Sequence, residues 1–334
     1  MTARTKRLTR TAIVVAVALG GIVLALAELC IGEPMLAPLQ VLEMLRHPDG
    51  SQAAVILHTL RVPRLLLAIA VGAALAVAGV IMQALTRNPL AEPGILGVNA
   101  GASFAVTLSF VVLGIRGFGA TLVIAAIGAA VAGVLVALLG GVGRSASVSR
   151  LILAGVALTA VLSGLTQALS LIDPAQYARI RVWEAGSLAA RDTTTALIVA
   201  GVVVTGLVLA LAIGPGLNLL VLGDDAARAL GARVEIVRAI GLVTIVLLCG
   251  TATAAIGPVA FVGLLVPHAV RAFTGGDQVR TLVASIAAGP VLLLVADLIA
   301  RTVAAPGEVP LGVVTAFLGA PVLIVLVNRR RRRS

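Results

Sequence analysis

Side chains that could carry out bond chemistry are few in this sequence. Lys6 is the only lysine among its 334 residues. A Walker A loop needs the pattern GxxxxGK[ST], so the chain cannot bind ATP through such a loop, and a membrane-embedded Schiff-base lysine is excluded as well. His47, His58 and His268 show no HExxH or other metal-ligand spacing. We therefore predict no catalytic residue, no metal site, no cofactor and no enzymatic activity of the chain's own.

One acidic residue lies deep in an apolar stretch. Asp297 precedes Arg301 by four residues, so on a helix the two side chains would share a face. One interpretation is a structural ion pair. The other is a coupling residue of an ion-driven carrier, because ionisable groups at membrane depth are costly and tend to be functional. Gln83 and Gln167 could line a pathway, although hydrogen bonding between helices is the commoner use of such residues.

The elements that hold these residues are predicted to be membrane spans. The chain is 60% hydrophobic and only 12% charged, with a mean hydropathy of +1.14, which no ordinary soluble domain reaches. Apolar runs long enough for a helix to cross a bilayer recur along it, without the alternation of a barrel strand. We predict an all-α polytopic membrane protein with about ten transmembrane helices. Their expected ranges are 11–31, 63–84, 94–114, 119–140, 151–171, 193–213, 237–257, 259–273, 280–300 and 308–327.

The positions of the basic residues predict the orientation. With the N-terminus inside, most of the 25 lysines and arginines fall in cytoplasmic segments, including a basic tail at 328–334. Both termini are therefore expected in the cytoplasm, and the net charge of +11 indicates topology rather than nucleic-acid binding. The first segment could instead be a cleaved signal peptide, with Ala25-Leu26-Ala27 as the cleavage site. An uncleaved span is preferred because the apolar run continues to Ile31.

Two irregular segments interrupt the spans. In TRNPLAEPGILGVNAGAS (86–103), prolines stop one helix and restart another, and Asn88 or Glu92 is expected to cap the new start. The segment 214–236 is predicted to be a long cytoplasmic loop that contains a short helix, with acids after Gly223 at its start and Gly231 at its end. This helix is either a connector or an element that a cytoplasmic partner grips.

Five ordered segments resemble the FecCD-type permeases of ABC importers, which import iron-siderophores, haem or cobalamin. The segments are RVPRLLLAIAVGAALAVAGVIMQALTRNPLAEPGILGVNAGA (61–102), SRLILAGVAL (149–158), LGDDAARALG (222–231), IGPVAFVGLLVPHAVR (256–271) and EVPLGVVTAFLGAPV (308–322).

The resemblance implies a single transmembrane permease domain, 1–334, with the type II ABC importer permease fold in the inner membrane. Its implied partners are two cytoplasmic ATPase subunits, a periplasmic or lipid-anchored binding protein, membrane lipids and a second permease, either a homodimer mate or a paralogue. We expect the chain to form the translocation path for a ferric siderophore. Haem and cobalamin stay open as alternative cargoes, and an ion-coupled secondary transporter stays open as an alternative class.

The resemblance also assigns expected roles to residues. Coupling to the ATPase is implied for Gly223, Asp224, Asp225, Ala226, Arg228, Ala229, Leu230 and Gly231. Docking of the binding protein is implied for Arg61, Arg64 and Arg301, whose charges would give orientation and association rate more than affinity. A cytoplasmic gate is implied at Ser147, Val148 and Ser149, where the valine would close the path by dewetting.

Overall fold

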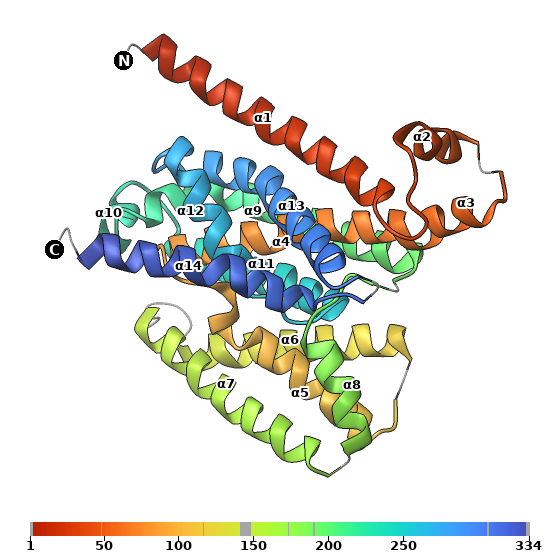
Figure 1. Cartoon of the computed structure of the whole chain (residues 1–334). Helices are drawn as coiled ribbons and strands as arrows, with labels where there is room; N and C mark the ends of the chain where they lie inside the picture. The colour runs from red at the N-terminus through yellow and green to blue at the C-terminus, as the bar shows by residue number, and fades with distance from the viewer. Residues whose placement is uncertain are drawn as a thin grey trace.

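The computed structural model describes residues 3–331, except 48, 116, 141–147, 173, 190 and 306. Every regular element in this part of the chain is helical (Figure 1). In chain order they are α1 (Ala3–Cys30), α2 (Pro38–Arg46), α3 (Gln52–Ile56), the π-helical turn η1 (Leu57–Arg61), α4 (Val62–Thr86), the 3₁₀ turn η2 (Pro93–Leu96), α5 (Val98–Val111), α6 (Phe118–Gly140), α7 (Val148–Ser170), α8 (Pro174–Glu184), α9 (Thr193–Leu220), α10 (Asp224–Ala229), α11 (Val234–Ile256), α12 (Val262–Thr274), α13 (Gln278–Val303) and α14 (Leu311–Arg331).

Long apolar helices make up most of the fold. Within the described residues, six helices are long and apolar enough to cross a membrane, namely α4, α6, α7, α9, α11 and α13. Shorter apolar stretches lie in α1, α5, α12 and α14. Each of the ten expected ranges overlaps one of these ten helices, which confirms the all-helical class. The number of membrane crossings stays a prediction.

Helix α4 is the centre of the bundle and packs against α9, α11, α12 and α13 (Figure 1). Small residues make this packing possible, because a Cβ atom on Gly72 would lie only 2.7 Å from the carbonyl oxygen of Gly289 in α13. Helices α5, α6 and α7 pack against one another beside this core, and the backbones of α5 and α6 cross closely at Gly101 and Gly128. Glycines therefore decide where these helices cross.

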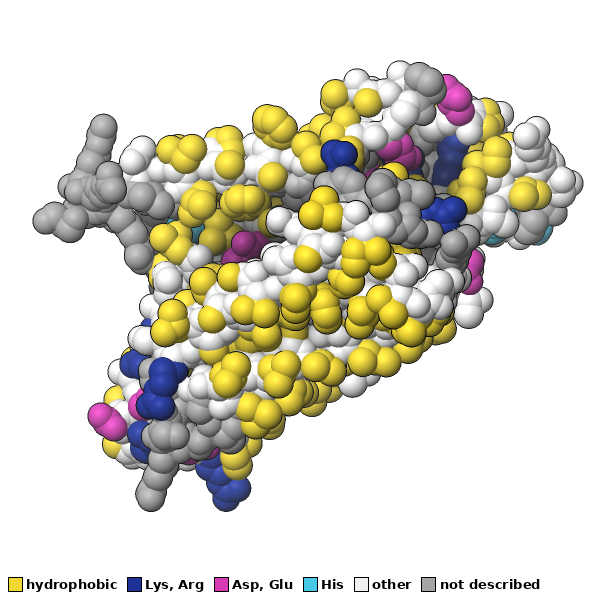
Figure 2. Space-filling view, turned by 90° about the horizontal axis from the view of Figure 1, so that it is seen from below, with side chains coloured by type: hydrophobic (Ala, Val, Ile, Leu, Met, Phe, Trp, Pro, Cys, Tyr) yellow, Lys and Arg dark blue, Asp and Glu magenta, His cyan; other side chains and the backbone are white. Residues whose placement is uncertain are grey.

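The two ends of the bundle hold different helices, and charged side chains lie mostly toward these ends. The chain termini and α10 lie at one end, whereas α2 and α3 lie at the other (Figure 1). Hydrophobic side chains cover the middle of the face seen in Figure 2, and most of the charged side chains on that face lie toward its two ends. This distribution is what a helical bundle needs when hydrocarbon surrounds its middle.

Two boundaries differ from the sequence prediction. The loop expected at 214–236 is shorter, because α9 continues to Leu220 through Pro215. Close packing explains the extension, since Cβ atoms on Gly214 and Gly216 would lie 2.9 Å and 2.6 Å from valine side chains of α13 and α11. The tail expected at 328–334 is helical at its start, because α14 runs to Arg331, and 332–334 lie outside the described residues.

The irregular segment 86–103 joins α4 to α5, as predicted, but neither Asn88 nor Glu92 caps the restarted helix. Asn88 accepts a hydrogen bond from the amide of Leu90 at 3.0 Å, within the turn before η2. Glu92 forms no cap at the start of η2; its carboxylate accepts the amide hydrogen of Phe261 at 2.6 Å, just before α12. A partner 169 residues away satisfies this carboxylate, and no local pattern could have indicated it.

Candidate functional site

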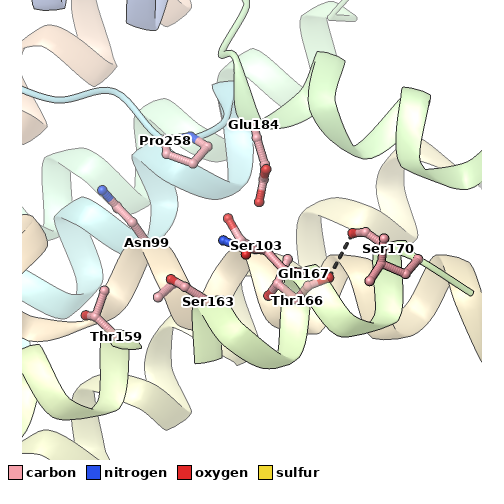
Figure 3. A pocket seen from close by; sticks show the side chains of 11 residues that line it. Asn99, Ser103, Thr159, Ser163, Thr166, Gln167, Ser170, Glu184 and Pro258 are labelled. Carbon is pink, nitrogen blue, oxygen red and sulfur yellow. Dashed lines mark hydrogen bonds between the residues drawn. The ribbon is translucent and has the colours of Figure 1, made fainter. Parts of the chain in front are cut away.

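A polar cavity of about 720 Å³ lies between α5, α7 and α8 (Figure 3). Its volume is typical of small-molecule sites in proteins. Seven of its eleven lining residues carry a hydroxyl or amide group, and α7 supplies five of these seven. The lining residues are Asn99, Ala100, Ser103, Thr159, Ser163, Thr166, Gln167, Ser170, Leu171, Glu184 and Pro258.

Glu184 is the only ionisable residue among the described lining residues. It is the last residue of α8, and its carboxylate points into the cavity toward Ser103 and Gln167 (Figure 3). Partial burial raises the pKa of Glu184, and a hydrogen bond with Ser103 opposes that shift. The hydroxyl and amide side chains can therefore form hydrogen bonds with a polar solute in the cavity. Such a solute would also lie beside the carboxyl group of Glu184.

The two glutamines noted in the sequence have different roles. Gln167 lines the cavity, in agreement with the pathway interpretation. Gln83 instead joins helices: its amide donates to the carbonyl oxygen of Gly263 at 3.1 Å and its carbonyl accepts from Arg271 of α12. The interpretation of Gln83 as an interhelical hydrogen-bonding residue is confirmed.

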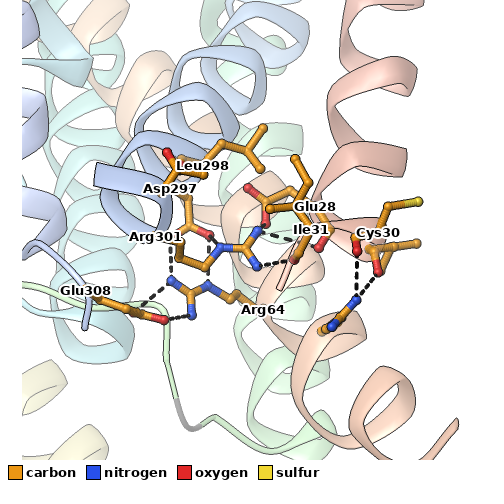
Figure 4. A network of polar contacts seen from close by, with 11 residues as sticks. Glu28, Cys30, Ile31, Arg64, Asp297, Leu298, Arg301 and Glu308 are labelled. Atoms are coloured by element: carbon orange, nitrogen blue, oxygen red, sulfur yellow. Dashed lines mark hydrogen bonds and ion pairs between the residues drawn. The ribbon is translucent and has the colours of Figure 1, made fainter. Parts of the chain in front are cut away.

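At the start of α4, Arg64 forms two bidentate ion pairs (Figure 4). Its guanidinium donates to both oxygens of Asp297, at 2.8 Å each, and to both oxygens of Glu308, at 2.7 Å and 2.9 Å. The side chain of Asp297 is only 1% exposed, whereas that of Glu308 is 37% exposed. Two carboxylates thus occupy Arg64, and only the pair with Glu308 faces water.

Arg301 belongs to the same cluster. It pairs with the buried Glu28 of α1 and also lies 3.4 Å from Asp297, without hydrogen-bond geometry at that contact. The i, i+4 pair of Asp297 and Arg301 is thus confirmed, but the closer partner of each lies on another helix. We call Glu28, Arg64, Asp297, Arg301 and Glu308 the arginine–carboxylate network.

Arg61 lies near this network but is held separately. Its guanidinium donates to the carbonyl oxygens of Leu29 at 2.6 Å and Cys30 at 3.2 Å, and also to that of Pro34. The residue is 6% exposed. The three arginines expected to dock a binding protein therefore lie at the same end of the bundle, and each has partners within the chain.

Helix α10 lies at the opposite end of α4. It runs from Asp224 to Ala229, after Gly223 with φ of +107° and before Gly231 with φ of +85°. These left-handed conformations favour glycine, so the expected helix start and stop are confirmed. Ala227 is fully buried and anchors the helix. The short helix is therefore a defined element in the connection between α9 and α11.

Charges around α10 stabilise its position. Asp224 accepts from Arg238 of α11 at 2.8 Å and lies 3.7 Å from Arg87, and Arg228 donates to Glu235 at 2.9 Å. Most residues from 221 to 231 are exposed, and they include apolar, small and charged side chains. The exposed residues are Val221, Leu222, Asp225, Ala226, Arg228, Ala229, Leu230 and Gly231.

The expected gate is only partly within the described chain. Ser147 lies outside the described residues, Val148 is the first residue of α7, and Ser149 is exposed on that helix. Val148 and Ser149 therefore begin the helix that supplies most of the hydroxyl and amide groups of the cavity.

Sequence reasoning missed two carboxylates. Glu308 completes the arginine–carboxylate network, and Glu184 places a carboxyl group in the cavity. Glu308 begins one of the family-like segments, which was a usable signal. Glu184 carried none, because its position depends on how α8 folds back toward α5 and α7.

Comparison with known proteins gives the family. The sequence profile of the FecCD transport family matches residues 15–329. The chain belongs to the FecCD transport family. It is 45% identical to the ferric enterobactin transport system permease protein FepD of Escherichia coli over 95% of this chain and 96% of FepD. It is 37% identical to the hemin transport system permease protein HmuU of Yersinia pestis over 82% of this chain and 83% of HmuU.

A solved structure described as an inward-facing conformation of a metal-chelate type ABC transporter has the same fold. It superposes with a TM-score of 0.84 at 28% identity, covering 96% of this chain and 99% of that chain. This FecCD protein is therefore a multi-pass permease subunit of an ABC importer in the cytoplasmic membrane. Its ATPase is a separate protein, and the expectation drawn from the single lysine and the missing Walker A loop is confirmed.

Proposed function

We propose that this FecCD permease forms the translocation path for a ferric siderophore. The observation that carries the proposal is the polar cavity, because a hydroxyl- and amide-lined space inside an apolar helical bundle provides polar contacts for a hydrated cargo. The siderophore class is supported by the similarity to FepD and by 37% identity to the probable siderophore transport system permease protein YfiZ of Bacillus subtilis. Haem is the second candidate, supported by the similarity to HmuU.

The α10 end is proposed as the contact with two cytoplasmic ATPase subunits. Both chain termini lie at this end, and the arginine-rich C-terminal sequence favours the cytoplasm for it. The exposed Leu222, Ala229 and Leu230 provide apolar contacts, while the ion pairs of Asp224 fix the turn. ATP-driven closure of the ATPases would then shift an equilibrium between outward and inward states of the permease.

The opposite end is proposed as the docking surface for an extracytoplasmic binding protein. Arg64 and Arg301 remain the candidate contacts, together with Arg61, because they cluster at this end. Since Arg64 already holds Glu308, an acidic group of a binding protein would replace the exposed Glu308 rather than the buried Asp297. Docking would then be an exchange of carboxylates.

A second permease copy is proposed to complete the path. In the most apolar stretch of α7 only 11% of the residues are buried, although this helix supplies most of the hydroxyl and amide groups of the cavity. A homodimer that pairs the α7 faces would cover that surface and enclose the polar lining. At the start of α7, Val148 would contribute to a gate that closes by dewetting.

Uptake into proteoliposomes tests the proposed function. The permease is reconstituted with its ATPase and binding protein, and accumulation of radioactive iron from a ferric siderophore is measured. We expect accumulation that needs ATP and the binding protein and persists without any ion gradient. Accumulation that needs an ion gradient and no ATPase would overturn the proposal in favour of an ion-coupled carrier using Asp297.

A further inference from the structure

We propose that α2 is an interfacial anchor, whose exposed leucines insert into the headgroup region of the bilayer at the end of the bundle opposite α10. Leu39 and Leu42 are 80% and 45% exposed, and Met35, just before the helix, is 78% exposed. The partner of this surface is the lipid that surrounds the bundle. This lipid contact does not depend on the cargo or on the proposed orientation of the permease.

Packing places α2 at the depth where the apolar run of α1 ends. Val41 is fully buried in a cluster with Leu29 and Cys30, the last two residues of α1. The amide of Leu36 donates to the carbonyl oxygen of Cys30 at 3.0 Å, so the chain turns back directly after α1. From Arg10, the last basic residue before the apolar run, α1 rises about 30 Å to Cys30, which is about the thickness of the hydrocarbon. Helix α2 therefore lies at the boundary between hydrocarbon and headgroups.

Helix α1 carries an apolar surface on the same outer side of the bundle as α2 (Figure 1). It packs mainly against α13, and its exposed side chains include Leu19, Ile22, Val23 and Leu26. In a multi-pass membrane protein, lipid covers a surface of this kind. The α7 face proposed for a second copy lies on the opposite side of the bundle (Figure 1). The leucines of α2 therefore continue a lipid-facing surface rather than the proposed dimer contact.

The side chains of α2 are arranged around its axis as in an interfacial helix. Val41 faces the core, whereas Leu39 and Leu42, three residues apart, share another side. Glu43 and Arg46 are exposed, and each lies four residues after one of these leucines. The exposed face is thus too charged for the hydrocarbon and suits the headgroup boundary, where the guanidinium of Arg46 can reach lipid phosphates.

The anchor is joined to the proposed docking end. Arg61 donates to carbonyl oxygens in the last turn of α1 and to that of Pro34, in the connection between α1 and α2. Arg301 donates to the carbonyl oxygen of Ile31 at 3.0 Å, in the same connection. Insertion of α2 therefore holds this connection, and with it two of the arginines, at a fixed depth. A binding protein would contact the arginine–carboxylate network while the leucines of α2 face lipid.

Fluorescence from single positions of α2 tests the anchor. The full-length Leu39→Cys and Gln40→Cys variants are labelled with nitrobenzoxadiazole and reconstituted into vesicles of phosphatidylcholine and phosphatidylglycerol. The native Cys30 and Cys249 are buried, and wild-type protein treated in the same way gives their background. Gln40 is the matched control, because it is exposed and turned by about 100° from Leu39 and about 160° from Leu42.

Two quenchers distinguish lipid from water. We expect lipids with a nitroxide near the headgroup end of the acyl chain to quench the label at Leu39 at least about threefold more strongly than the label at Gln40. Aqueous iodide should show the reverse order, and a label on Leu42→Cys should behave like that at Leu39. Both results are expected without ATPase or binding protein.

Equally weak quenching by the nitroxide lipids at Leu39 and Gln40 overturns the anchor. A label at Leu39 that iodide quenches freely until the binding protein is added, with no quenching by the nitroxide lipids, also overturns it and assigns this surface to the binding protein. Strong lipid quenching at Leu39 that the binding protein leaves unchanged supports the anchor, whatever cargo the complex transports.

Discussion

The two ends of α4 use their charges in different ways. At its first turn, Arg64 belongs to a network in which Glu28 and Asp297 are almost fully buried. At its last turn, Arg87 adjoins the α10 turn, whose ion pairs are partly exposed and whose leucines are uncovered. One end is therefore satisfied within the chain, so a partner there must compete with internal ion pairs. The other end offers apolar surface that no described residue covers.

Removing a buried carboxylate should have the largest effect. Asp297→Ala leaves Arg64 and Arg301 without their shared buried partner, and we expect a loss of roughly 3–5 kcal/mol in the free energy of unfolding. Denaturation of the purified protein in mild detergent measures it. A loss below about 1 kcal/mol would show that water reaches this cluster. The charges at the first turn of α4 would then not be more buried in effect than those at its last turn.

Charging the uncovered surface of the α10 turn should affect assembly rather than folding. Leu222→Glu or Leu230→Glu places a carboxylate where an apolar contact is proposed, and we expect ATPase affinity to fall at least about tenfold while the unfolding temperature stays constant. Copurification and titration of the ATPase measure this. Leu39→Glu, at an 80% exposed leucine of α2 at the other end, is the matched control and should bind the ATPase normally.

Removing the exposed partner of Arg64 should strengthen docking at the first turn of α4. Glu308→Gln removes the carboxylate with which an acidic partner would compete, so we expect binding-protein affinity to rise roughly two- to fivefold, mainly through the association rate. Surface plasmon resonance at low and high salt measures both rates. Weaker docking would instead show that Glu308 contacts the binding protein directly.

The smallest effect is expected at Asp225. This carboxylate is fully exposed and lies 3.6 Å from Arg228, so solvent screens the pair almost completely. Asp225→Asn should leave the unfolding temperature and ATPase affinity unchanged within error. A clear loss of ATPase binding with normal folding would make Asp225 a direct contact and would add charge to an interface that we describe as apolar.

Sequence patterns predicted the bundle better than the contacts within it. Apolar runs predicted the six long apolar helices and the four helices with shorter apolar stretches. Glycines predicted the start and end of α10. Both signals are local in the sequence. The short α2, α3 and α8 were missed, since none is long or apolar enough to be read as a span. The partners of Arg64, the contact from Glu92 to Phe261 and the place of Glu184 depend on segments brought together only by folding.

Site-specific photo-cross-linking tests the proposed division of the two ends most directly. Benzoylphenylalanine is placed at Ala229 of α10 and, separately, at Val303 beside the arginine–carboxylate network, and the complete transporter is irradiated in membranes. We predict that the probe at Ala229 captures the ATPase and not the binding protein, and that the probe at Val303 captures the binding protein and not the ATPase. Capture of the binding protein from Ala229, or of the ATPase from Val303, would contradict the proposed orientation.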